Sequence, residues 1–182
     1  MNDNRRSIMD PPAVERALSR MAEEILRLAG GTESLVLVGI HRRGVELAER
    51  ISDAVEALDG RPVPTGSLDI TLYRDDLMVV GPRPVIGPTR LPGSGIDERV
   101  VVIVDDVLYT GRTVRAALDE LADFGRPRRT LLAVLVDRGG RELPICADVV
   151  GERVEVPDGG RVEVLVPEID GRLGVELVHG EA

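Results

Sequence analysis

The chain has 182 residues, 43% of them hydrophobic, with a formal net charge of −9 and a single cysteine. This composition predicts one soluble, cytoplasmic domain over residues 1–182, because no 18-residue apolar run or charged-then-apolar leader occurs and one cysteine cannot form an intramolecular disulfide. The negative charge argues against non-specific nucleic-acid binding, which needs a broad basic surface, but leaves room for a local basic patch.

The first third of the chain is predicted to form a helix, a strand and a second helix. Asp10 precedes two prolines, which is typical of a helix start with an acidic N-cap, and apolar residues then recur at helical spacing until a Gly-Gly pair at 30–31. A short apolar strand is expected at 35–40. A second amphipathic helix is expected from about 45 to 58.

Strands and helices continue to alternate in the rest of the chain. Another strand lies within 63–72, and residues 73–99, rich in proline and glycine, are predicted to form a long mobile loop. An apolar strand at 101–104, a helix at about 111–124 and a strand at 131–136 follow, and strand-like runs near 161–167 and 173–178 form a small C-terminal β region. The order predicts an α/β fold, with a parallel sheet and helices on both faces.

The run from 101 to 113 is the most informative segment. Four β-branched residues precede Asp105 and Asp106, which are predicted to end a buried strand at the carboxyl edge of the sheet, where open α/β sheets bind ligands. Thr-Gly-Arg-Thr at 110–113 then offers hydroxyls, backbone N–H groups and one cation at a helix N-terminus, which together form an anion site. The run lacks both the P-loop and the Gly-x-Gly-x-x-Gly patterns.

This run resembles the signature of type I phosphoribosyltransferases, which bind phosphoribosyl pyrophosphate (PRPP). The resemblance implies a type I phosphoribosyltransferase fold: a central parallel sheet flanked by helices, with a mobile lid loop. In that family the two acids, here Asp105 and Asp106, hold the ribose hydroxyls, and the following loop holds the 5-phosphate. The resemblance therefore assigns to PRPP the residues Asp105, Asp106, Val107, Leu108, Tyr109, Thr110, Gly111, Arg112 and Thr113.

A second anion-binding loop is predicted one β-α unit earlier, between Gly39 and Gly44. Glycines let the backbone approach an anion closely, and an arginine can neutralise charge on a leaving group. The family resemblance assigns His41, Arg42, Arg43 and Gly44 to the pyrophosphate of PRPP. It also implies a lid at 68–77 whose Arg74 reaches the pyrophosphate as a catalytic residue, although a solvated charge cluster at a strand end is the alternative. All 23 cationic residues are arginine, so lysine nucleophiles and Schiff bases are excluded.

Three segments narrow the resemblance to the pyrimidine operon regulator (PyrR) family, over about residues 8–152: 68–77, 104–119 and 132–139. Members are uracil phosphoribosyltransferases that in many bacteria also bind a hairpin in pyrimidine operon mRNA. This implies transfer from PRPP to uracil, giving UMP and pyrophosphate, with Mg²⁺ held mainly by PRPP and no protein metal site. Val136, Asp137 and Arg138 are assigned to base binding, and relatives assemble as homodimers or homotetramers. Purine-specific relatives carry an acid where this chain has Tyr109.

The positions at which this chain departs from the family pattern bear on RNA binding. Glu23 stands where relatives commonly have histidine, Gly140 and Cys146 replace a histidine and an arginine, and the segment 151–157 differs. Since phosphate contacts dominate RNA affinity, we expect weakened or lost RNA binding, with Arg128, Arg129 and Arg141 as remaining candidate contacts. A non-catalytic PRPP- or nucleotide-sensing regulator, or a transferase for another base, are alternatives. The roles of Cys146 and of the tail beyond 152 stay open.

Overall fold

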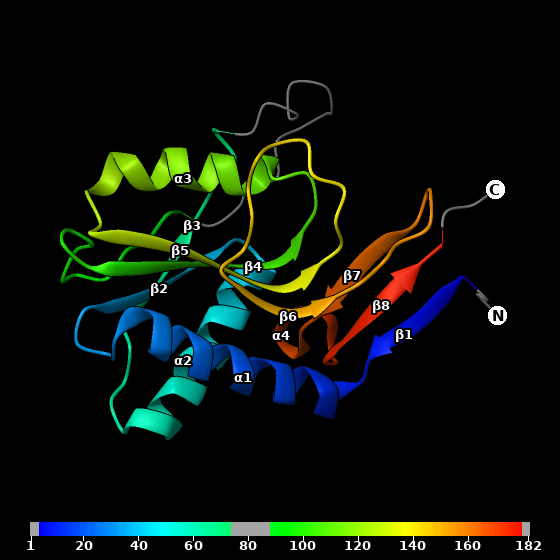
Figure 1. Ribbon diagram of the computed structural model, residues 1–182, viewed down its shortest axis with the longest axis horizontal. Helices are drawn as coiled ribbons and strands as arrows, with labels where there is room; N and C mark the ends of the chain where they lie inside the picture. The colour runs from blue at the N-terminus through cyan, green and yellow to red at the C-terminus, as the bar shows by residue number, and fades with distance from the viewer. Residues whose placement is uncertain (1–3, 74–87, 180–182) are drawn as a thin grey trace.

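The computed structural model describes residues 4–73 and 88–179 of the chain. Along these residues the elements are β1 (Arg5–Met9), α1 (Pro11–Ala29), β2 (Leu35–Ile40), α2 (Arg43–Asp59), β3 (Thr65–Leu68), β4 (Val100–Leu108), α3 (Arg112–Phe124), β5 (Arg129–Asp137), β6 (Val149–Arg153), β7 (Arg161–Leu165), α4 (Pro167–Asp170) and β8 (Gly174–Val178). Figure 1 shows a central sheet between two layers of helices, with β1, β7 and β8 beside it.

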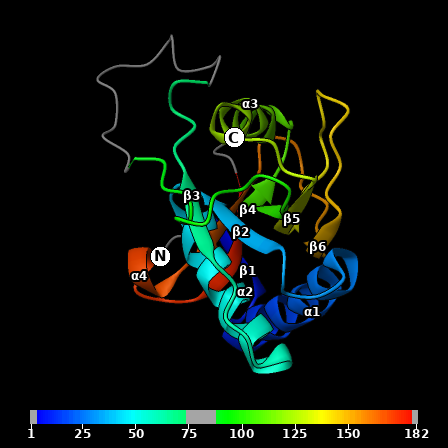
Figure 2. The same cartoon turned by 90° about the vertical axis from the view of Figure 1, so that its left-hand side faces the viewer.

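The central sheet has five parallel strands in the order β3-β2-β4-β5-β6. α3 covers one face, and α1 and α2 cover the other (Figures 1 and 2). This arrangement confirms the predicted parallel sheet with helices on both faces. Because all five strands are parallel, their C-termini lie on one edge of the sheet, so the loops that follow β2, β4 and β5 meet there.

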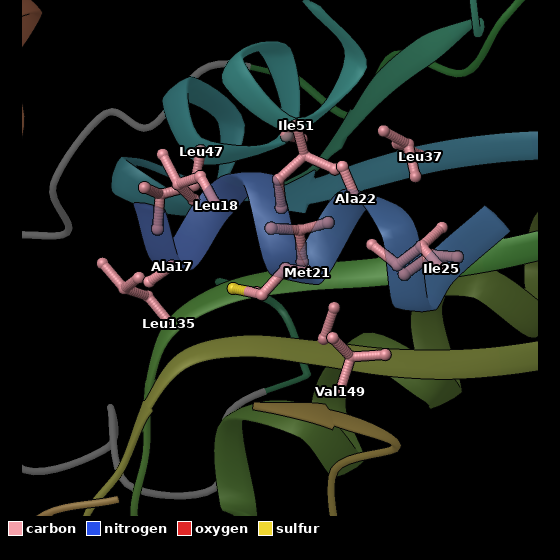
Figure 3. Packing of buried hydrophobic residues seen from close by; sticks show 14 of the residues in the cluster. Ala17, Leu18, Met21, Ala22, Ile25, Leu37, Leu47, Ile51, Leu135 and Val149 are labelled. Carbon is pink, nitrogen blue, oxygen red and sulfur yellow. The ribbon is translucent and has the colours of Figure 1, made fainter. Parts of the chain in front are cut away.

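Two apolar clusters hold these layers together. On one face, α1 and α2 pack on alternate residues of the strands; Figure 3 shows Met21 and Ile25 of α1 lying between Ile51 of α2 and Val149 of β6. On the other face, α3 packs on the intervening strand residues, such as Ile103. Because residues facing both sides of the sheet are buried in β2 and in Val100–Val104 of β4, neither stretch shows the polar alternation of a half-exposed strand.

A second sheet is antiparallel, in the order β1-β8-β7. The strand-like runs predicted in the C-terminal region correspond to β7 and β8. Sequence reasoning missed β1 and β6. β1 has the sequence Arg-Arg-Ser-Ile-Met. Its first three residues are polar, and all three are exposed, so the sequence lacks the apolar alternation that predicts a strand.

Several boundaries differ from the predictions. α2 begins at Arg43, two residues early, and β3 covers only Thr65–Leu68. The prediction of a mobile loop over 73–99 is wrong for its C-terminal part. The backbones of Ser67 and Arg90 exchange hydrogen bonds of 2.7 and 2.9 Å, and Ile96 is buried. Residues 74–87 of that loop, with the predicted lid residue Arg74, lie outside the described residues.

The predicted start of α1 is confirmed, and its cap provides a stability test. The Asp10 carboxylate accepts a 2.9 Å hydrogen bond from the backbone N–H of Ala13. Asp10→Ala is expected to lower the free energy of unfolding by about 1 kcal/mol, while Asp10→Asn, which keeps the acceptor oxygen, is expected to lose much less. Urea denaturation of the three proteins measures this difference. Equal losses for the two variants would contradict the capping role.

Candidate functional site

β4 extends beyond its neighbour β2, which leaves its last residues, including two aspartates, unpaired on that side of the sheet. Pairing between β2 and β4 ends at Gly39 and Val104, whereas pairing between β4 and β5 continues to Leu108 and Asp137. The prediction that the strand ends at Asp105 and Asp106 is therefore wrong, since β4 continues through both. Because β2 has already turned away, the two aspartates still lie beside an open part of the carboxyl edge.

The two aspartates are fixed by the backbone that follows each of them. The Asp105 carboxylate accepts a 2.9 Å hydrogen bond from the N–H of Asp106, and the Asp106 carboxylate accepts one of 2.8 Å from Val107. Burial raises the pKa of Asp106 above its ordinary value, although these neighbours and Arg43 oppose the shift. Two preorganised carboxylates at this edge suit the binding of vicinal hydroxyl groups.

The loop from Gly39 to Gly44 folds tightly against this edge. A Cβ on Gly39 would lie 2.4 Å from the carbonyl oxygen of Gly44, and a Cβ on Gly44 would lie 2.5 Å from that of Val104. Both positions therefore require glycine because the backbone packs closely there, and the predicted approach of this loop to an anion stays a prediction. The peptide bond between His41 and Arg42 is cis.

The side chains of this loop differ in their surroundings. Arg42 is exposed; the Nε2 atom of His41 is buried and has no hydrogen-bond partner within residues 4–73 and 88–179. Arg43 is the first residue of α2 and forms an ion pair with Asp170 of α4. A loop that leads directly into a 17-residue helix presents that helix's N-terminal N–H groups to the same edge.

The segment after β4 encloses a cavity of about 330 Å³. Asp105 and all of the predicted PRPP-site residues from 107 to 113 line this cavity, together with Val114 and Glu142. Gly111 has a φ of 94°, a left-handed conformation that favours glycine, and directly precedes α3. The guanidinium of Arg112 donates to the Glu142 carboxylate at 2.8 Å. Glu142 is a lining residue that sequence reasoning missed.

The turn after β5 faces Tyr109 across the site. The N–H of Arg138 donates to the Leu108 carbonyl at 3.1 Å, and its guanidinium lies 4.0 Å above the centre of the Tyr109 ring. The side chain of Val136 is fully buried in the core, so this residue offers a ligand only backbone groups. Of the three predicted base-binding residues, Asp137 and Arg138 have side chains outside the core.

Arg141, predicted as a candidate RNA contact, binds this turn from within. Its guanidinium donates to the Asp137 carboxylate at 2.5 Å and to the carbonyl oxygens of Tyr109 and Ile145 at 2.7 and 3.0 Å. Burial of Asp137 favours its neutral form, but the hydrogen bonds from Arg141 and the Gly139 N–H outweigh it and lower the pKa. Arg141 therefore links the segments after β4 and β5.

The other two RNA candidates lie at the opposite edge of the sheet. Arg128 and Arg129 are exposed at the start of β5, where they donate to Ser34 and to the Leu28 carbonyl. From Arg129 to Asp137 the strand spans roughly 26 Å. Arg128 and Arg129 are therefore too far from Arg141 to form one basic patch with it.

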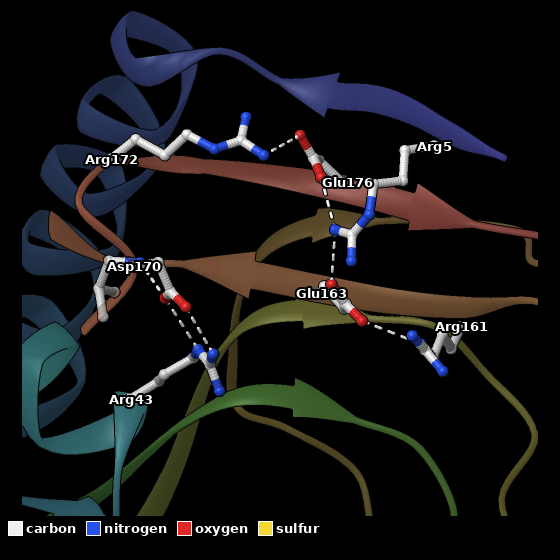
Figure 4. A network of polar contacts seen from close by, with 8 residues as sticks. Arg5, Arg43, Arg161, Glu163, Asp170, Arg172 and Glu176 are labelled. Carbon is white, nitrogen blue, oxygen red and sulfur yellow. Dashed lines mark hydrogen bonds and ion pairs between the residues drawn. The ribbon is translucent and has the colours of Figure 1, made fainter. Parts of the chain in front are cut away.

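The tail beyond 152 also contributes to the site. Arg43, Asp106 and Asp170 line a cavity of about 490 Å³ with residues of β1 and β7, and Figure 4 shows the ion pairs around it. Sequence reasoning missed Asp170 because 127 residues separate it from Arg43. Among the described residues no group of three or more His, Cys, Asp or Glu side chains is arranged to hold a metal, and none of the helices there has the length and apolar character that crossing a membrane requires.

Comparisons with known proteins agree with this geometry. The profile of the phosphoribosyl transferase domain family matches residues 4–159. A curated relative from Thermus aquaticus, named bifunctional protein PyrR, is 55% identical over 174 residues, which cover 96% of each chain. Another protein of the same name, from Pelotomaculum thermopropionicum, is 52% identical over 172 residues, which cover 94% of each chain.

Solved structures support the fold. A hypoxanthine phosphoribosyltransferase from Staphylococcus aureus is similar over 99% of this chain and 94% of its own, with a TM-score of 0.69 and 18% identity. The corresponding enzyme from Trypanosoma cruzi has a TM-score of 0.71 over 97% of each chain, again at 18% identity. The fold is that of the type I phosphoribosyltransferases, and the chain belongs to the phosphoribosyl transferase domain family and, within it, to the PyrR family.

Proposed function

We propose that this phosphoribosyltransferase joins uracil to PRPP, releasing pyrophosphate and forming UMP. The observation that carries the proposal is the meeting of three loops at one sheet edge. They are the tight glycine loop before α2, the carboxylates and phosphate loop of β4 and α3, and the turn after β5. Each loop offers the chemistry that one part of the reactants needs: an anion site, two carboxylates with a second anion site, and a polar turn.

Asp105 and Asp106 would orient the ribose through its hydroxyls, and the 110–113 loop would anchor the 5-phosphate. Arg43 and the backbone of the first loop would stabilise the charge that develops on departing pyrophosphate. The rate enhancement then comes from positioning and charge stabilisation, without a covalent nucleophile. Arg74 stays a proposed contact outside the described residues.

Mg²⁺ fits this arrangement as an ion held mainly by the substrate. Asp105 and Asp106 supply carboxylate oxygens, which Mg²⁺ prefers, but the described residues supply no third acid beside them. The ion would neutralise phosphate charge when PRPP binds. The chain's own residues would bind and orient the ribose.

Tyr109 supports a pyrimidine as the acceptor. The Arg138 guanidinium lies over one face of its ring, and neither tyrosine nor arginine carries a carboxylate that could exchange a proton with a purine ring. Arg138 has a buried Nε without a partner among the described residues, and its N–H donors suit the carbonyl oxygens of uracil.

A screen of uracil, orotate, hypoxanthine and adenine with PRPP and Mg²⁺ tests the proposal. Pyrophosphate release that requires uracil supports it. Pyrophosphate release with hypoxanthine alone would indicate that the acceptor is a purine and not uracil. No reaction with any base, combined with retained PRPP binding, would favour a nucleotide-sensing regulator without catalysis.

Arg141 provides a sharper test of base binding. Arg141→Gln removes the donors that hold Asp137 and the Tyr109 carbonyl, so the turn after β5 should lose its orientation. We expect the KM for uracil to rise about tenfold, the scale of one charge-assisted hydrogen bond, and the KM for PRPP to rise less, because Arg141 contacts the segment after β4 only through backbone carbonyls. Steady-state kinetics with each substrate varied separately measures both. A matched rise in the two KM values would contradict a role confined to the base.

A second function, binding of pyrimidine operon mRNA, is proposed to be weak in this chain. The name of the relatives includes the word bifunctional, but here Arg141 is engaged inside the site and Arg128 and Arg129 lie at the other edge of the sheet. The net charge of −9 also opposes binding to phosphates. Titration of a pyrimidine operon leader RNA at low salt tests this, and nanomolar binding that depends on uridine nucleotides would refute it.

A homodimer or homotetramer is the assembly proposed for this chain. Light scattering in solution checks it.

A further inference from the structure

Arg43 is held by a carboxylate from the C-terminal segment. Its Nε and Nη2 atoms donate to the two oxygens of Asp170 at 3.2 and 2.8 Å. Figure 4 shows the two side chains reaching toward one another, Arg43 from the start of α2 and Asp170 from α4. Such a two-point contact fixes the plane of the guanidinium as well as its position.

The contact leaves one end of the guanidinium available. Within the described residues, Nε and Nη2 of Arg43 have hydrogen-bond partners, whereas Nη1 has none. Arg43 lines the cavity of about 490 Å³ that Asp106 also lines, so the guanidinium borders the open space beside the ribose-binding carboxylates. The side chain is 35% exposed, which permits contact with a ligand.

Asp170 is itself well fixed. Its carboxylate accepts a 2.9 Å hydrogen bond from the N–H of Val166, which directly precedes α4. The hydrogen bond from Arg43 lowers the pKa of Asp170, so it is charged at neutral pH. A long, flexible arginine side chain is thus tied to a short one that the backbone holds in place.

The ion pair is not needed merely to attach α4 to α2. The neighbouring acid Glu168 already contacts Arg50, further along α2, at 2.7 Å. That pair connects the same two helices away from the cavity. The Glu168–Arg50 pair can therefore hold α4 against α2. The additional effect of the Arg43–Asp170 pair is to orient Arg43 at the end of the loop from Gly39 to Gly44.

We propose that Asp170 is a positioning residue that holds the Arg43 guanidinium for the pyrophosphate group of PRPP and of the released product. This inference rests on the proposed function and gives the C-terminal segment a part in it. Holding the arginine beforehand reduces the conformational entropy lost when the anion binds. The nucleotide product, which lacks pyrophosphate, gains nothing from the same contact.

The test compares Asp170→Asn with Glu168→Gln in the full chain. Asparagine keeps the size of the side chain and an acceptor for the Val166 N–H but loses the charge and one acceptor for Arg43. Calorimetry with Mg²⁺-pyrophosphate and, separately, with UMP gives two dissociation constants. Steady-state kinetics gives kcat and the KM for PRPP.

For Asp170→Asn we expect the pyrophosphate Kd and the KM for PRPP to rise about tenfold, the scale of ordering one long side chain on binding. The Kd for UMP and kcat should stay within twofold of wild type, and Glu168→Gln should change none of the four values. Unchanged pyrophosphate affinity in Asp170→Asn would overturn the proposal. So would tighter binding, which would make Asp170 a competitor of the anion, or equal weakening for UMP, which would indicate loss of structure.

These results are separable from a failure of the proposed function. If the wild type binds pyrophosphate in an Asp170-dependent manner but transfers to no base, the positioning role stands and the transferase proposal fails. If the wild type binds neither pyrophosphate nor PRPP, both are overturned.

Discussion

Replacing Asp106 with asparagine is expected to lower kcat/KM for PRPP by about 100-fold, because a ribose hydroxyl loses its bond to a charged acceptor. The acceptor for the Val107 N–H is kept, so the loop after β4 should retain its shape. Asp53→Asn, at an exposed position of α2, is the matched control and should leave kcat/KM unchanged. Activity within threefold of wild type in Asp106→Asn would contradict the assigned role.

The same substitution should raise stability near neutral pH. Burial raises the pKa of Asp106 in the folded state, so over the range between its unfolded and folded pKa values the folded protein binds more protons. Stability therefore falls as pH rises through that range, and the cost persists above it. Asparagine carries no charge, so the variant avoids the free-energy cost of burying an ionised carboxylate. Urea denaturation at pH 7 should therefore show a higher free energy of unfolding for the variant. Below the unfolded pKa the difference should vanish.

The pH dependence of activity follows from the same shift. Because the ionised carboxylate is the better acceptor for ribose, kcat/KM should fall on acidification through a pKa above that of an ordinary aspartate. The Asp53→Asn protein should show the wild-type profile. An acid limb at the ordinary aspartate pKa would contradict the effect of burial.

Gly39→Ala is expected to lower kcat/KM for PRPP by at least about 100-fold, the scale of a displacement of about 1 Å at a catalytic site. The new Cβ would lie 2.4 Å from both the Gly44 oxygen and the Val45 Cα, and these backbone atoms cannot rotate aside. The loop that leads into α2 must move, and Arg43 moves with it. Overpacking of this kind should also lower the free energy of unfolding by about 1–3 kcal/mol.

Gly93→Ala is the control for this prediction. A Cβ on Gly93 would meet no atom within 4 Å, and the backbone there is not left-handed, so alanine should be neutral at this position. Kinetics and urea denaturation of both variants measure the contrast. Wild-type activity in Gly39→Ala would show that the loop need not approach α2 so closely.

Local sequence patterns were sufficient to predict most of the fold and part of the candidate site. The Asp105–Thr113 segment is contiguous, so its composition was enough to predict a binding site at one sheet edge, and the α1 cap was evident from Asp10. Arg141 illustrates the limit. Its charge suggested a surface contact, but its partners lie on two other segments and are determined by tertiary packing. Asp170 could not be predicted for the same reason. No local sequence pattern indicates that α4, near the end of the chain, contacts the start of α2.

The pairing of β1 with β8 has a consequence for synthesis. Arg5 is aligned with Val178, so β1 emerges from the ribosome long before its partner strand exists. Asp170 likewise joins Arg43 only after most of the chain has been translated. Contacts this distant in sequence form late. A nascent chain that has completed the central sheet would therefore still lack the carboxylate that holds Arg43, and the core residues Val164, Val166 and Val175 that the C-terminal segment supplies.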